Sequence, residues 1–344
     1  MKPIMPKLLG NRTLAQKLGR DILSGEMSHA YIIGGPAQSG KHTLAYQIAA
    51  SLACENKSHS ALPLPCGKCE ACRKIFSKIS PDVILVREDS KSSIGVDLIR
   101  EIRTGVLSYP NDLDVKVYII ENADKMTPQA QNAFLLTLEE PPPYVLFLLL
   151  CERPEDMLET IRSRAPIIRT EPLTPRQIEE FLESNESTSD LKSTSPDEFY
   201  EIVMASGGRL GEAIELSDPD MREYVFAQRE HARSFVESMS KRATASEILD
   251  IIEGFPKVRS ELADRLSLIL TALRDLAVLK KSESAPLCFY HNRETALELS
   301  DRFSMFSLLA LVDACENARR SILHNANIKL TLSNLVTRGN YGTK

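Results

Sequence analysis

Residues 31–41 read YIIGGPAQSGK, and this stretch decides the fold of the chain. A short apolar run ends in two glycines, and from Thr43 onward apolar residues recur at helical spacing, which predicts a strand, a glycine loop and a helix. Gly35, Gly40 and Lys41 have the spacing of a loop whose backbone N–H groups and lysine cradle phosphates. The alternative is a loop in which the glycines only make a tight turn. The lysine and the strand-helix context favour a nucleotide-binding fold.

The residue after Lys41 departs from the usual pattern of such loops. A hydroxyl that holds magnesium is expected there, but the residue is His42, and Thr43 points about 100° further round the helix. Hydrolysis also needs an acidic pair at the end of a neighbouring strand, one carboxylate for the metal and one to polarise water. Here the strand ends in Glu121 and Asn122, and an amide cannot accept a proton. ATP or ADP is therefore expected to bind weakly or without hydrolysis, and a magnesium site is doubtful.

Apolar runs alternate with helical patterns through the first half of the chain. Three more runs follow the first, from residues 83–86 to residues 145–150, which predicts a buried parallel sheet covered by helices. After residue 169 only helical patterns continue. The expected fold class is α/β, with a P-loop nucleotide-binding domain followed by helical domains. The expected boundaries are 1–170 for the nucleotide-binding domain, 171–218 for a small helical domain and 219–344 for a C-terminal helical domain.

Four of the seven cysteines are clustered. Cys66, Cys69 and Cys72 are spaced by two residues each, and Cys54 precedes them at the end of the first helix of the glycine-loop unit. Four thiolates are the ligand set of a closed, tetrahedral structural zinc site, so residues 54–72 are expected to form a zinc module. A dithiol redox role, or His59 in place of Cys54 as a ligand, are the alternatives.

Composition limits the class of protein. The 344 residues exceed the size of one small domain, and the net charge of −5 argues against a protein that coats nucleic acid by bulk electrostatics. No apolar run is long enough for a membrane helix, and the first residues lack a signal-peptide core, so a cytoplasmic protein is expected. The remaining cysteines, Cys151, Cys288 and Cys315, lie in apolar surroundings and are expected to be buried small side chains.

Several segments together resemble one known family. SHAY at residues 28–31, the four-cysteine module and NAFLLTLEEPP at residues 132–142 are similar to the bacterial DNA polymerase III clamp-loader subunits, which are AAA+ proteins. The resemblance covers roughly residues 8–217, and the helical remainder is similar to the family's C-terminal collar only in length and class. It implies an AAA+ domain, a helical lid and an oligomerisation collar.

Within this family the sequence resembles the delta-prime members more than the gamma and tau motors, whose phosphate loop and acidic pair are intact. Residues 160–165, TIRSRA, resemble the family's Ser-Arg-Cys motif, whose arginine reaches a neighbouring ATP site, with Ala165 in place of the cysteine. The resemblance makes Arg164 that arginine; an arginine that only solvates a strand entry is the alternative. Gly211 aligns with the motors' sensor arginine, although Arg209 nearby leaves this alignment open.

The implied function is a delta-prime-like subunit that helps to load the sliding clamp on primed DNA. Its implied partners are the gamma or tau and delta subunits, the clamp and DNA held by the assembled complex. It is expected to lack ATPase activity of its own while forming part of the DNA-directed DNA polymerase III holoenzyme. The alternative is an ATP-hydrolysing gamma/tau-like motor. A third possibility, a zinc or thiol redox enzyme, has little support in the sequence.

Overall fold

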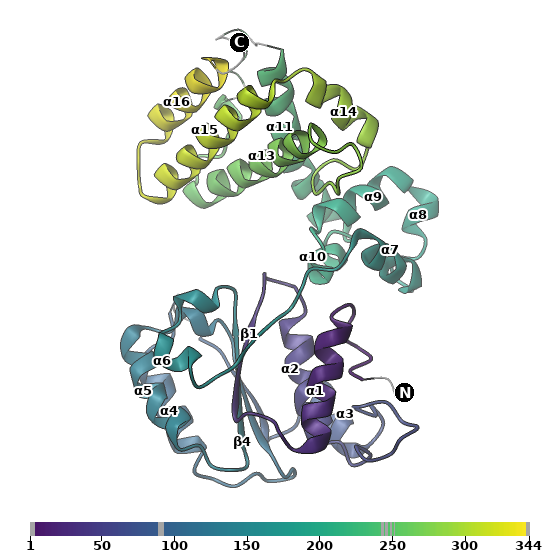
Figure 1. Cartoon of the computed structure of the whole chain (residues 1–344), viewed down its shortest axis with the longest axis vertical. Helices are drawn as coiled ribbons and strands as arrows, with labels where there is room; N and C mark the ends of the chain where they lie inside the picture. Colours follow the sequence, from purple (N-terminus) through teal and green to yellow (C-terminus); the bar gives the residue numbers. More distant parts are fainter. Residues whose placement is uncertain are drawn as a thin grey trace. The chain divides into compact units, whose positions relative to one another are not determined.

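A computed structural model of the chain describes residues 4–88, 93–241, 244, 247, 250 and 252–341 (Figure 1). The chain divides into two compact units. The first unit comprises Met1–Gln177 with Arg209–Gly211, and the second comprises Ile178–Gly208 with Glu212–Lys344. None of the described helices is long and apolar enough to cross a membrane.

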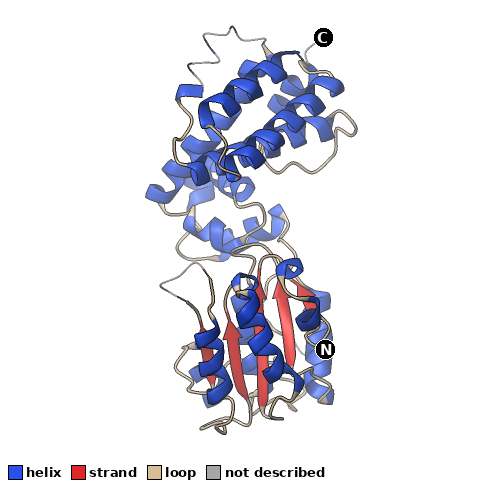
Figure 2. Cartoon of the chain, turned by 90° about the vertical axis from the view of Figure 1, so that its left-hand side faces the viewer, coloured by secondary structure: helices blue, strands red, loops and turns tan. Residues whose placement is uncertain are grey.

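A five-stranded parallel sheet forms the centre of the first unit, and Figure 2 shows its strands side by side. The spatial order is β2-β3-β4-β1-β5. The central strands are buried along their whole length, and apart from Lys116 at the start of β3 none of them carries a charged residue. The strands are β1 (Ala30–Gly34), β2 (Val83–Val86), β3 (Lys116–Ile120), β4 (Val145–Cys151) and β5 (Ile167–Arg169).

Helices cover both faces of this sheet (Figure 1). On one face, Ile33 and its neighbours pack with α1 (Arg12–Ser24), α2 (Lys41–Leu52) and α3 (Glu70–Phe76). On the other face, Phe147 packs edge-on against Phe134 with ring centroids 5.1 Å apart. Phe134 belongs to α5 (Pro128–Glu139), which lies with α4 (Val96–Gly105) and α6 (Glu159–Arg162) over that face. The expected α/β fold with a parallel sheet is confirmed.

Two residues fix the start of α5. The Thr127 side chain accepts a hydrogen bond from the Ala130 N–H at 3.2 Å, and Pro128 occupies the first helical position. One strand, β5, was not among the apolar runs from which the sheet was predicted. β5 is only three residues long, and Ile167 and Arg169 are exposed, so it lacks the continuous apolar run of the other strands.

The second unit is helical, and its core is formed by long helices that pack against one another. Leu266 and Leu273 on one helix and Leu311 on another are fully buried in this core. The helices beyond the sheet are α7 (Pro175–Ser184), α8 (Leu191–Thr194), α9 (Pro196–Ala205), α10 (Leu210–Glu215), α11 (Pro219–Ser240), α13 (Arg259–Leu279), α14 (Arg293–Asp301), α15 (Met305–Leu323) and α16 (Ile328–Tyr341).

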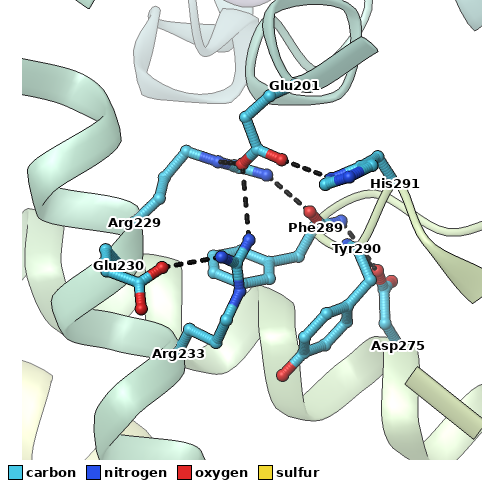
Figure 3. A network of polar contacts seen from close by, with 8 residues as sticks. All are labelled: Glu201, Arg229, Glu230, Arg233, Asp275, Phe289, Tyr290 and His291. Atoms are coloured by element: carbon cyan, nitrogen blue, oxygen red, sulfur yellow. Dashed lines mark hydrogen bonds and ion pairs between the residues drawn. The ribbon is translucent and has the colours of Figure 1, made fainter. Parts of the chain in front are cut away.

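A buried polar network joins three segments of the second unit (Figure 3). Glu201 of α9 accepts a hydrogen bond from Arg229 Nε of α11 at 2.7 Å, and its second oxygen lies 2.6 Å from His291 Nδ1. Arg229 also donates to the Phe289 carbonyl oxygen at 2.5 Å. The Glu201 and Arg229 side chains are only 10% and 4% exposed. Burial raises the pKa of Glu201, but the Arg229 guanidinium offsets this and holds that pKa below its ordinary value.

A second buried carboxylate fixes the chain before α14. Asp275 of α13 accepts hydrogen bonds from the backbone N–H groups of Cys288, Phe289 and Tyr290. Cys288 itself is exposed, with Arg274 Nη1 3.0 Å from its sulfur, so the expectation that it is buried is wrong. Asp275 holds the backbone N–H of Cys288, while the thiol lies at the surface. Cys151 and Cys315 are buried as expected.

Candidate nucleotide and metal sites

The glycine loop connects β1 to α2 and packs closely against the end of β5. Gly40, which precedes α2, has a φ of 85°, a conformation that favours glycine. A Cβ at Gly35 would lie 2.2 Å from Thr170 Oγ1, so only glycine fits there. Ser39 Oγ lies 2.7 Å from the same Thr170 oxygen. The predicted strand-loop-helix is confirmed, and Thr170 is a loop contact that the sequence did not reveal.

The side chain of Lys41 contacts the backbone of this loop. Its ammonium donates hydrogen bonds to the carbonyl oxygens of Gly35 at 2.7 Å and Pro36 at 2.6 Å. The residue is only 8% exposed, and burial lowers the pKa of its ammonium group. A phosphate that binds at this loop must therefore replace one or both carbonyl oxygens as the partner of Lys41.

His42 and Glu121, which were singled out separately in the sequence, are in direct contact. His42 Nε2 donates a hydrogen bond to Glu121 Oε1 across 2.6 Å. The His42 side chain is 51% exposed, the Glu121 side chain 22%. Thr43, the next residue of α2, is also exposed. The imidazole therefore lies where the loop would need a hydroxyl, and it already binds the nearest carboxylate.

The residues that follow Glu121 at the end of β3 form no hydrogen bond with His42 in the described structure. Asn122 is exposed and has a φ of 50° at the start of a short 3-10 helix. Asp124 accepts hydrogen bonds from the backbone N–H groups of Glu152 and Arg153, both at 3.1 Å. These contacts hold Asp124 Oδ2 against the chain that follows β4.

This arrangement does not fit a magnesium ion. Magnesium requires oxygen ligands in near-octahedral geometry at about 2.1 Å and keeps several waters. A metal placed between Glu121 Oε1 and the start of α2 would have to displace the His42 ring, whose Nε2 lies 2.6 Å from that oxygen. Asp124 Oδ2 is held by the backbone after β4, and its Oδ1 is buried and accepts no hydrogen bond, so it does not face the His42–Glu121 pair as a free ligand would. We therefore derive no metal-assisted step at this loop.

The four clustered cysteines meet in the first unit. Their sulfur atoms all lie within 4.8 Å of one another, and all four residues are buried. Cys54 follows α2, and Cys72 lies within α3. The Cys66 N–H donates to Cys54 Sγ, and the Cys69 N–H donates to Cys66 Sγ, each at 3.4 Å.

These thiols fit a tetrahedral zinc site. Zinc–sulfur bonds of about 2.3 Å place the ligands of such a site about 3.8 Å apart, within the observed limit. The backbone donors would stabilise thiolates, and burial closes the site to substrates. His59 is exposed and does not belong to this cluster, and its Nδ1 accepts a hydrogen bond from the Ala61 N–H at 3.3 Å.

Arg164 follows α6 at the surface of the first unit. Its Nη1 donates to the Thr160 carbonyl oxygen at 3.0 Å, and its Nη2 donates to Glu139 Oε1 at 2.9 Å. The side chains of Arg164 and Glu139 are 36% and 47% exposed, whereas Ala165 is buried. Glu139 lies in the quoted run at residues 132–142, but no sequence pattern indicated this pairing.

Residues 209–211 return to the glycine loop and belong to the first unit. The Gly211 N–H donates to the Gln38 carbonyl oxygen at 3.4 Å. A Cβ at Gly211 would lie 2.9 Å from the Cβ of Gln38, so a larger residue would displace the loop. The segment that resembles a sensor region thus contacts the nucleotide loop through its backbone.

Two family models match the chain. One, described as DNA polymerase III, delta subunit, covers residues 10–174, and the other, described as DNA polymerase III, delta subunit, C terminal, covers residues 229–340. The chain is 37% identical to the tau subunit of Bacillus subtilis over 157 residues, which are 46% of this chain and 27% of that protein. The chain thus spans about a quarter of the length of that relative.

Two delta-prime subunits are also similar. The chain is 35% identical to the DNA polymerase III subunit delta' of Yersinia pestis over 142 residues, 41% of each chain. It is 26% identical to the delta' subunit of Bacillus subtilis over 356 residues, 98% of this chain and 95% of that protein. The likeness to tau is confined to part of each chain, whereas the likeness to this delta' spans both.

Proposed function

This chain belongs to the family of DNA polymerase III clamp-loader subunits, and on that premise we propose that it acts as a delta-prime-like subunit of the cytoplasmic replication machinery. In this proposal it assembles with gamma or tau and delta subunits and helps to load the sliding clamp on primed DNA. The observation that carries the proposal is the contact between His42 and Glu121. It leaves the chain's own AAA+ nucleotide site without a fitting metal site, while Asn122 supplies no general base.

The chain would act on its neighbour through Arg164. The Arg164 guanidinium is partly exposed, and its partner Glu139 is an exposed carboxylate. Arg164 can therefore exchange this carboxylate for a phosphate of a neighbouring subunit. An arginine placed at the phosphates of an adjacent subunit stabilises the negative charge that develops as the terminal phosphate leaves. A subunit that does not hydrolyse ATP can in this way accelerate hydrolysis next to it.

We further propose that Cys54, Cys66, Cys69 and Cys72 hold a structural zinc ion. The ion supplies a cross-link and no reaction step. Because Cys54 directly follows α2, the ion would fasten the far end of the helix that begins at the glycine loop. The domain division that goes with this proposal is an AAA+ domain at 1–170, a lid at 171–218 and a collar at 219–344.

The competing function is an ATP-hydrolysing motor like gamma and tau. It is favoured by the 37% identity to the tau subunit and by the intact Gly35, Gly40 and Lys41. It requires that His42 leave Glu121 when nucleotide binds. ATP turnover by the purified chain distinguishes the two functions.

The test is steady-state ATP turnover by gamma or tau and delta subunits reconstituted with this chain, clamp and primed DNA. With Arg164→Ala, the stimulation due to this chain should fall to the level measured without it. The matched control is Arg100→Ala, which removes another exposed arginine from a surface ion pair, with Asp97, and should retain stimulation. Turnover by the chain alone, together with full stimulation by Arg164→Ala, would show a motor.

A further inference from the structure

The contact between His42 and Glu121 has a consequence for which ligand the glycine loop accepts. We propose that this loop binds the phosphates of a nucleoside di- or triphosphate without a divalent cation, and that His42 is the residue that sets this metal independence. The inference rests on the nucleotide-binding fold of the proposed function, but not on any role of Arg164.

His42 occupies the position in which a P-loop holds its cation. A P-loop holds its metal between a hydroxyl from the helix start and an acidic group at the end of a neighbouring strand. In this chain those two positions hold His42 and Glu121, and they bond directly at 2.6 Å. A hydrogen-bonded imidazole therefore fills the space between the groups that would share the ion. Imidazole is also a poor ligand for magnesium, which prefers hard oxygen ligands.

The groups needed for phosphate remain in place. α2 begins at Lys41, so the N–H groups of its first turn have no partner within the helix and face the loop. Lys41 can exchange its two carbonyl partners for phosphate oxygens, and an anion would offset the burial that lowers the pKa of its ammonium group. The phosphate charge is then balanced by Lys41 and the backbone donors, with the His42 ring beside them.

Two other side chains near the loop could serve as metal ligands, Asp124 and Thr43. Asp124 Oδ2 is engaged by the backbone after β4, and Asp124 Oδ1 is buried. Thr43 lies one residue further round α2 than the position of a metal-binding hydroxyl. Exchanging His42 for threonine would place a hydroxyl at that position and release Glu121. The chain thus carries a metal site that one substitution should restore in part.

The experiment is isothermal titration of the full, zinc-loaded chain with ADP and with ATP. Buffer freed of divalent ions on a chelating resin is compared with the same buffer containing excess Mg²⁺. Soluble chelators are avoided, because they would also remove zinc from the cysteine cluster. The variants are His42→Thr and, as a matched control that keeps the His42–Glu121 contact, Thr43→Ser. Thermal melting establishes that each variant is folded.

For the native chain and Thr43→Ser, Mg²⁺ should leave the affinity unchanged within about twofold, or weaken it because the ion captures nucleotide in solution. For His42→Thr, Mg²⁺ should tighten binding at least about tenfold, equivalent to about 1.4 kcal/mol. Tighter binding by the native chain with Mg²⁺, no binding under either condition, or a His42→Thr variant without Mg²⁺ dependence would each overturn the inference. The stimulation assay with Arg164→Ala is unaffected by these outcomes, so the proposed function fails or stands separately.

Discussion

Replacing Glu201 by glutamine should destabilise the second unit strongly. The substitution keeps the volume of the side chain but removes the charge that compensates Arg229, which is only 4% exposed. Arg229 would keep two contacts with Phe289. Its guanidinium donates a hydrogen bond to the Phe289 carbonyl oxygen, and its guanidinium carbon lies 4.4 Å from the centre of the Phe289 ring. Removing one partner of a buried ion pair costs about 3–5 kcal/mol, and because a glutamine oxygen still accepts a hydrogen bond, the lower end applies.

This loss should be visible as a shift in melting temperature. In a unit of roughly 160 residues, each kcal/mol lowers the midpoint by about 2–4 °C, so Glu201→Gln should lower it by about 6–12 °C. Differential scanning calorimetry of the full chain measures the transition. The matched control is Glu230→Gln, which removes a 61% exposed partner of Arg233 and should change the free energy of unfolding by less than about 1 kcal/mol. Equal shifts for the two variants would refute the reasoning.

Three further predictions concern Glu201, the cysteine cluster and the Arg164–Glu139 pair. The pKa of Glu201 is held below its ordinary value of about 4.3, so its stabilisation is present above that pH and is lost as the pH falls through the folded-state pKa; the difference in melting temperature between native chain and Glu201→Gln should therefore shrink in acid. Removal of zinc by a chelator, or Cys72→Ser, should lower the free energy of unfolding of the first unit by several kcal/mol and leave the transition of the second unit in place; an unchanged first transition would contradict a structural metal. Glu139→Gln should release Arg164 from an exposed ion pair worth less than about 1 kcal/mol, and so reduce the concentration of this chain that gives half-maximal stimulation by up to about fivefold, whereas an increase would mean that Glu139 positions the arginine for use.

The strands that could be predicted from the sequence are those with apolar residues on both faces. The strands β1, β3 and β4 were recognisable because both faces of each are buried, so that apart from Lys116 at the start of β3 they carry no charged residue. β5 was missed because an edge strand of three residues needs to bury only one of its side chains, Ile168. The cysteine cluster was recognisable because its ligands are close in the sequence and their chemistry is uncommon.

The contacts within the candidate sites could be predicted only in part. His42 and Glu121 each departed from a known pattern, but they are 79 residues apart, and only the order of the strands brings them together. The pairing of Arg164 with Glu139 depends on how α5 and α6 approach each other, which a helical pattern does not specify. No sequence pattern singled out Glu201. It is buried because α11 and the chain around Phe289 supply its partners from distant parts of the sequence.

The ion pair between Arg164 and Glu139 bears on how the proposed assembly should respond to salt. When the guanidinium moves to a neighbour's phosphate, one charge pair is broken as another forms, so this contact changes the number of ion pairs little. Salt weakens the association of two proteins more when the association creates more new exposed charge pairs. Engagement of this arginine should therefore tolerate salt concentrations that weaken contacts made by unpaired surface lysines or arginines, and any strong salt dependence of subunit assembly should arise elsewhere on the chain.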